Sequence, residues 1–279
     1  MLFVASGALT ITLITLTNRK AVHTSRTLWG VLATNYATAL TLSFILAFFS
    51  GMRPTSTFTW VLGFATGFLY TGGMFLGMKT IGRRGATIAA SASQLSILIP
   101  VSLSLAIFGE SLRVSQVAGV AIALVALPLL ASRGKGGGGS MERGTLLLLA
   151  ALLLVQGFAQ FSSKVMVASG LQAETGAFFI AVFTSATFVT APIALRHRRD
   201  VRSTDIGYGA IVGACNIGGN LSILLALTSL PGAVVFPLVS SGGLLLVTTL
   251  TRLLYSERVG RVNALGMALT LSAVILINI

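Results

Sequence analysis

Residues 145–163 read TLLLLAALLLVQGFAQFSS, nineteen consecutive residues without a charge. A helix needs about 20 apolar residues to cross the hydrocarbon core of a bilayer, so this stretch is long enough to span it. The residues do not alternate between polar and apolar, as barrel strands do, and lipid offers no partner for an unpaired backbone amide. The stretch therefore predicts a transmembrane helix with two amide side chains, Gln156 and Gln160, inside it.

Nine further stretches are also predominantly apolar and about as long. The ten predicted spans cover residues 1–17, 28–49, 58–78, 85–108, 114–131, 145–163, 174–195, 206–228, 233–254 and 260–278. Of the 279 residues 54% are apolar and 9% charged, whereas a soluble domain is about a quarter charged, so a water-soluble globule is excluded. The first span lacks a basic segment before its apolar run, so we expect a retained helix and not a cleaved signal peptide.

The charges predict the orientation. A net charge of +13 would suggest nucleic acid as the partner of a soluble protein, but here the basic residues lie in short loops, where they set topology. Only Arg53, Arg113 and Lys164 fall on one side of the predicted membrane. The other sixteen are Arg19, Lys20, Arg26, Lys79, Arg83, Arg84, Arg133, Lys135, Arg143, Arg196, Arg198, Arg199, Arg202, Arg252, Arg258 and Arg261. This excess predicts a multi-pass protein of the cell (inner) membrane with both termini extracytoplasmic.

The chain also matches itself after a shift of 147 residues. The shift superposes unusual residues on their counterparts: Gly72 on Gly219, Gly85 on Gly232, Glu110 on Glu257, and Gly119 on Gly266. We therefore expect an N-terminal repeat over 1–132, a Gly-rich linker over 133–144, either natural or an engineered tether, and a C-terminal repeat over 145–279. Because each repeat holds five spans, an odd number, the second enters the membrane inverted. The alternative is that both halves merely share a hydrophobic composition.

The fourth span of each repeat begins Gly-Ala and ends in an aromatic residue, a small residue and Glu, before a fifth span that bears Gly. The segments are Gly85-Ala86…Phe108-Gly109-Glu110…Gly119 and Gly232-Ala233…Tyr255-Ser256-Glu257…Gly266, and Lys20 and Lys164 end the two first spans. This pattern resembles the EamA-type carriers of the drug/metabolite transporter superfamily. The chain departs from that family in lacking a Trp-Gly pair in its first span and in the predicted location of its termini.

The resemblance implies an all-α integral membrane fold, with ten transmembrane helices in two inverted five-helix repeats around a central cavity. It also implies alternating access, and the family moves amino acids, nucleotide sugars and triose phosphates. The nine residues expected to line the cavity are polar residues inside spans: Asn35, Tyr36, Tyr70, Gln94, Gln156, Gln160, Asn216, Asn220 and Ser240. Gln156 and Gln160 share a helix face, as do Asn216 and Asn220, and paired amides suit a zwitterion or a polyol. The alternative role of these amides is hydrogen bonding between helices.

The expected function is secondary transport, by an exporter or facilitator, of small neutral or zwitterionic metabolites such as amino acids. No Asp or Glu lies in the middle of a span, which disfavours a proton-coupled drug/metabolite antiporter. An exchanger of phosphate-bearing anions, using Lys164 and Arg252, is a second possibility. Asp-rich metal motifs and protease motifs are missing, so we expect no enzyme; a structural or assembly protein stays open.

The expected partners are a small-molecule substrate and the lipid bilayer, and no nucleic acid. We expect a monomer or weak homodimer. The single Cys215 and the distant His23 and His197 predict no metal site, and no cofactor motif is present.

Overall fold

The computed structural model describes residues 2–49, 55–84, 93, 96–109, 113–131, 143–255 and 261–278. These residues are almost entirely helical and contain no strand. The α-helices are α1 (Leu2–Thr24), α2 (Leu28–Phe49), α3 (Thr57–Arg84), α5 (Leu98–Phe108), α6 (Val114–Ala131), α7 (Arg143–Ala168), α8 (Thr175–Arg196), α9 (Ser203–Leu227), α10 (Gly232–Tyr255) and α11 (Arg261–Asn278), with a 3-10 turn η1 (Gln172–Glu174) before α8.

Several of these helices are long and apolar enough to cross a bilayer. Within the described residues six qualify, namely α1, α2, the Thr57–Thr80 part of α3, the Leu147–Ala168 part of α7, η1 with α8, and α9. Their outward faces carry large exposed apolar side chains, such as Phe48 at 75% exposure and Phe188 at 76%. A soluble protein rarely exposes so much apolar surface, whereas lipid accepts it. The chain is therefore an all-α protein of the kind that lies in a membrane.

Several helices run past the ends of the predicted spans: α1 ends at Thr24 and α7 at Ala168, whereas the spans were predicted to end at residues 17 and 163. α3 continues to Arg84, past the predicted end at residue 78, and in this extension the ammonium group of Lys79 lies 5.9 Å from the ring centroid of Phe75. α5 begins at Leu98, so Pro100 lies in its first turn, where the missing N–H of proline does no harm. Pro237, in contrast, lies inside α10.

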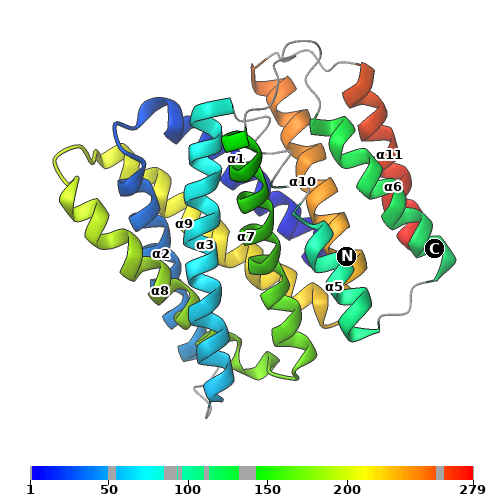
Figure 1. The fold of residues 1–279 in the computed structure, drawn as a ribbon, viewed down its shortest axis with the longest axis horizontal. Helices are drawn as coiled ribbons and strands as arrows, with labels where there is room; N and C mark the ends of the chain where they lie inside the picture. Colours follow the sequence, from blue (N-terminus) through cyan, green and yellow to red (C-terminus); the bar gives the residue numbers. More distant parts are fainter. Residues whose placement is uncertain are drawn as a thin grey trace.

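The helices pack in a paired arrangement (Figure 1). α2 packs against α8 and α9, and α8 packs against α2 and α3. Next to these helices, α1 packs against α9 and α10, and α7 packs against α3 and α5. α6 and α11 lie side by side at one edge of the molecule (Figure 1). A shift of 147 residues carries the bounds of α2 onto those of α8, and the bounds of α6 onto those of α11.

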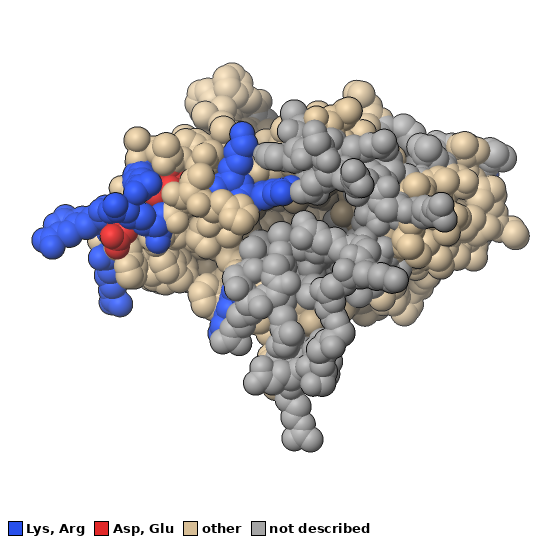
Figure 2. Space-filling view, turned by 90° about the horizontal axis from the view of Figure 1, so that it is seen from above, with Lys and Arg blue, Asp and Glu red and all other residues tan. Residues whose placement is uncertain are grey.

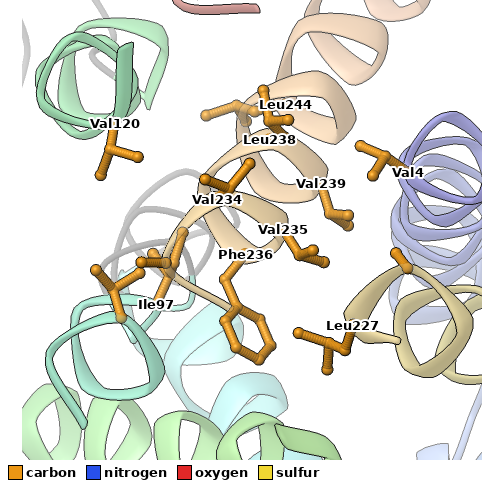
Figure 3. Packing of buried hydrophobic residues seen from close by; sticks show 13 residues of the cluster. Val4, Ile97, Val120, Leu227, Val234, Val235, Phe236, Leu238, Val239 and Leu244 are labelled. Atoms are coloured by element: carbon orange, nitrogen blue, oxygen red, sulfur yellow. The ribbon is translucent and has the colours of Figure 1, made fainter. Parts of the chain in front are cut away.

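The described helices enclose two apolar cores. One lies around α10 and gathers side chains from several helices, among them Val4 of α1, Val120 of α6 and Phe236 of α10 (Figure 3). The other lies between α2 and α8 and includes the fully buried rings of Tyr36 and Phe183. Hydrogen-bonding side chains from α2, α3 and α9 gather beside this second core.

Candidate functional site

Two glycines allow α9 to lie directly on α2. A Cβ atom added at Gly209 would lie 2.6 Å from the carbonyl oxygen of Val31, and one added at Gly213 would overlap the carbonyl oxygen of Asn35. A side chain at either position would push the helices apart, so the Gly-x3-Gly spacing sets their separation. This contact brings Asn35 of α2 next to Asn216, which lies one turn beyond Gly213 on α9.

The carboxamides of three asparagines form a chain of hydrogen bonds across this contact. Nδ2 of Asn216 donates to Oδ1 of Asn35 at 3.3 Å. Nδ2 of Asn220 donates to Oδ1 of Asn216 at 2.8 Å and also to its carbonyl oxygen at 2.8 Å. Asn35 is fully buried and Asn216 is 8% exposed, so the chain lies inside the protein.

Two tyrosines extend this chain to α3. The hydroxyl of Tyr70 donates to Oδ1 of Asn220, and the hydroxyl of Tyr36 donates to the carbonyl oxygen of Tyr70 at 3.2 Å. We call Asn35, Tyr36, Tyr70, Asn216 and Asn220 the polar network. The structure thus brings five of the nine predicted cavity residues together at the junction of α2, α3 and α9.

One amide of the polar network has hydrogen-bonding capacity to spare. Nδ2 of Asn35 is buried and has no hydrogen-bond partner. A buried donor without a partner is destabilising, by about 1–3 kcal/mol, so such a group in a native protein calls for an explanation. The oxygens of Asn35, Asn216 and Asn220 each already accept a bond. The network therefore offers a donor, and it suits a ligand that brings an acceptor: a carbonyl, a hydroxyl or a carboxylate.

The side of α8 that faces this network is apolar. The rings of Tyr36 and Phe183 lie 6.4 Å apart between centroids, and Phe183 also lies 6.5 Å from Tyr70. The 147-residue shift places Val182 and Phe183 on α8 where α2 has Asn35 and Tyr36. The polar groups of the junction thus come from α2, α3 and α9, while α8 supplies aromatic and aliphatic surface.

The remaining predicted residues lie elsewhere. Nε2 of Gln160 donates to Oγ of Ser96 at 3.0 Å, just before α5. Gln156, on the same face of α7, lies instead against α3, where a Cβ atom on Gly73 would be 3.0 Å from its Cγ. Ser240 is buried on α10 and takes part in neither set of hydrogen bonds. Gln94 lies outside the described residues.

Charged groups are rare near these side chains. In the described segments no Asp or Glu takes part in the polar network, and no group of three His, Cys, Asp or Glu could hold a metal ion. Lys164 near the end of α7 is buried at 8% exposure, with Nζ 5.4 Å from the ring centroid of Phe108. Glu110, Glu257 and the side chain of Arg252 lie outside what the structure describes.

Two carboxylates that the sequence analysis did not single out join loops to helix ends. Asp205 is fully buried and accepts hydrogen bonds from the hydroxyl of Ser25 at 2.6 Å and the backbone N–H of Arg202 at 2.9 Å. Glu174 accepts from the backbone N–H of Ser56 at 2.9 Å. Ser25 precedes α2 and Ser56 follows it, so the two contacts lie at opposite ends of that helix. In the sequence, an acidic residue in the first turn of a helix, such as Asp205, is the signal that could have predicted a carboxylate accepting hydrogen bonds at a helix start.

Comparisons with known proteins place the fold and leave the activity open. No family model matches the chain. A protein described as uncharacterized, from Haemophilus influenzae, is 26% identical over 251 residues, which cover 87% of this chain and 86% of that protein. A solved crystal structure superposes with a TM-score of 0.77 at 15% identity, covering 99% of this chain and 94% of that one. The helical arrangement is therefore one that a solved protein also adopts.

Proposed function

We propose that this protein is a secondary carrier of small neutral or zwitterionic solutes, amino acids among them. The observation that carries the proposal is the polar network with the unpartnered Nδ2 of Asn35. Polar groups inside a membrane protein are unfavourable unless they pair with one another or serve a ligand. All five residues are linked to one another by hydrogen bonds, and Nδ2 of Asn35 is the donor left over, which a solute that brings an acceptor would satisfy.

The finer architecture of the proposal is ten transmembrane helices in two inverted five-helix repeats. The 147-residue shift supports it, since it relates α2 to α8 and α6 to α11 by their bounds. The packing supports it too, because α2 with α9 and α8 with α3 are equivalent pairs under the shift. Inverted repeats are common in secondary transporters, which bind their substrates at the interface between the repeats. The polar network joins the same two halves, through Asn35 of one and Asn216 of the other.

The proposed mechanism is alternating access about this junction. Glycine contacts hold α9 on α2, and similar contacts hold α3 on α8, where a Cβ atom on Gly63 would lie 2.9 Å from the carbonyl oxygen of Phe178. Each pair would move as a unit. The Ser25–Asp205 contact joins the start of α2 to the start of α9, and the Ser56–Glu174 contact joins the start of α3 to the start of α8, so each would move with its own pair. Access from either side would require the two pairs to move relative to each other at the polar network.

The chemistry of the junction favours an uncharged or zwitterionic solute. Asparagine amides and tyrosine hydroxyls donate and accept hydrogen bonds without carrying charge. A cationic drug would need a carboxylate in the pathway to balance its charge, and the polar network contains none. The aromatic surface of α8 would receive the apolar part of the solute.

Exchange of phosphate-bearing anions is a second proposal, and it rests on Lys164. A buried ammonium group inside a bundle is expensive and marks a site of function by default. If anions are the cargo, Lys164→Gln together with Arg252→Gln abolishes their uptake. A carrier of neutral solutes would keep most of its activity in the same double variant.

The test is a transport panel in liposomes. Purified protein is reconstituted, and the uptake of labelled amino acids, sugars, phosphate esters and organic cations is measured with and without a pH gradient. The proposal predicts saturable uptake of a neutral or zwitterionic member. Uptake of phosphate esters alone would favour the second proposal, and no uptake of any class, with folded protein in the membrane, would favour a structural role.

A further inference from the structure

Two loops that lie far apart in the sequence carry exposed arginines and meet on one surface. Arg196 ends α8, the loop between α8 and α9 holds Arg198, Arg199 and Arg202, and the loop between α1 and α2 holds Arg26; all five residues are exposed. We call these five residues the basic patch. Figure 2 shows Lys and Arg side chains gathered toward one end of the face seen from above.

Two contacts hold the two loops together. The Ser25 hydroxyl donates to Asp205 at 2.6 Å, which ties the α1–α2 loop to the start of α9. The side chain of Val201 lies against Gly30 at the start of α2, where an added Cβ atom would be 2.8 Å from Cγ1 of Val201. Asp205 is fully buried beneath the loops, so its negative charge does not face the solvent. Asp200 is the exposed carboxylate within the α8–α9 loop.

We infer that the basic patch binds the headgroups of anionic phospholipids. The patch begins at Arg196, the last residue of a candidate membrane span, so it lies at the depth of lipid headgroups. Just before it, Leu195 is 67% exposed and Phe188 is 76% exposed, which gives the acyl chains of the same lipid an apolar surface. Clusters of four to eight Lys or Arg at the end of a membrane span attract anionic lipids, and arginine also pairs with a phosphate through two parallel bonds. Five arginines against one exposed carboxylate make this surface selective for negative headgroups.

The two tryptophans of the chain provide a local test. Trp29 is next to Gly30 and therefore beside the basic patch, while Trp60 lies in the first turn of α3, beyond the opposite end of α2. The variants Trp60→Phe and Trp29→Phe each leave one reporter. Each is reconstituted in phosphatidylcholine nanodiscs that contain a small fraction of a dibrominated lipid, which quenches nearby tryptophan. The quenching lipid is either phosphatidylglycerol or phosphatidylcholine.

The inference predicts that brominated phosphatidylglycerol quenches Trp29 more strongly than brominated phosphatidylcholine does, whereas the two lipids quench Trp60 equally. A triple variant removes three charges of the basic patch in the Trp60→Phe background: Arg196→Gln/Arg198→Gln/Arg199→Gln. It lowers the relative affinity for phosphatidylglycerol about tenfold. The matched control is Arg133→Gln/Lys135→Gln/Arg143→Gln. It removes the same charge from the same predicted side of the membrane and leaves the preference for phosphatidylglycerol intact. Equal quenching of Trp29 by both lipids would overturn the inference.

A further arm separates lipid from free phosphate. Millimolar inorganic phosphate is added to the nanodiscs, and the quenching of Trp29 is measured again. A lipid site keeps its preference, because the acyl chains hold the headgroup on the surface. Loss of the preference at this concentration would mean that the patch binds soluble phosphate, and it would overturn the assignment to lipid.

Discussion

Asn216 donates a 3.3 Å hydrogen bond from its amide nitrogen to the amide oxygen of Asn35, which lies 181 residues away in the chain. The bond forms because Gly209 and Gly213 let the backbones of α9 and α2 approach to contact. It joins the two predicted repeats at a point where both side chains are buried. The proposed site thus depends on helix packing as well as on the asparagines themselves.

The packing of α9 on α2 predicts that Gly213→Ala is destabilising. The added methyl group would overlap the carbonyl oxygen of Asn35, and overpacking of this kind typically lowers the free energy of unfolding by about 1–3 kcal/mol. We expect a lower midpoint of thermal unfolding in detergent and loss of the Asn216–Asn35 bond.

Gly207→Ala is the matched control, because it lies on the same helix and an added Cβ atom meets no other atom within 4 Å. Its midpoint should equal or slightly exceed that of the wild type, since alanine favours helix more than glycine does. Equal destabilisation by the two variants would show that the α2–α9 contact is not specific.

The contact between Asp205 and Ser25 predicts a second, local effect. Asp205→Ala removes the acceptor of two hydrogen bonds at the start of α9, and bonds to a charged group contribute about 1.5–3 kcal/mol each. The amides in the first turn of α9 and in the loop before α2 should exchange with deuterium faster, as measured by mass spectrometry.

Asp200→Ala removes an exposed carboxylate five residues earlier, and it serves as the control. Exchange in the same peptides should not change. If Asp200→Ala and Asp205→Ala accelerate exchange alike, the effect comes from loop charge and not from the contact with Ser25.

Much of the fold follows from the sequence, because lipid imposes a simple rule on helices. Apolar length predicted the helices that are long enough to cross a bilayer, six of them within the described residues, and the Gly-x3-Gly spacing of Gly209 and Gly213 is a sequence signal for the close helix contact that the structure shows. The predicted span 85–108 contains α5 at Leu98–Phe108, while residues 85–92, 94 and 95 of that span lie outside the described residues.

The candidate site was predictable in its residues but not in its grouping. The spacing of Asn216 and Asn220 placed them on one face of α9, and the structure links them by a direct bond. The same spacing failed to predict that Gln156 and Gln160 contact different elements, since helix periodicity does not say which neighbour covers a face. The bonds from Tyr36 and Tyr70 depend on how α2, α3 and α9 cross, which a single sequence does not encode locally.

The distribution of Lys and Arg predicts the sidedness of the termini. A green fluorescent reporter fused after Ile279 should be dark, and alkaline phosphatase at the same position should be active, because sixteen of the nineteen basic residues would then be cytoplasmic. A fluorescent fusion would reverse the predicted orientation or remove one span from the count.

The polar network is tested most directly by solute uptake at equal protein density in liposomes. Asn216→Ala removes the link between Asn35 and Asn220, whereas Ser222→Ala, on the same helix, removes a hydroxyl that bonds Ser6 and the carbonyl of Gly218. For whichever solute the wild type transports, Asn216→Ala should lower the initial rate about tenfold or more, equivalent to about 1.4 kcal/mol. Ser222→Ala should retain the wild-type rate. Wild-type transport by a folded Asn216→Ala variant would contradict the assignment of the network as the solute-binding site.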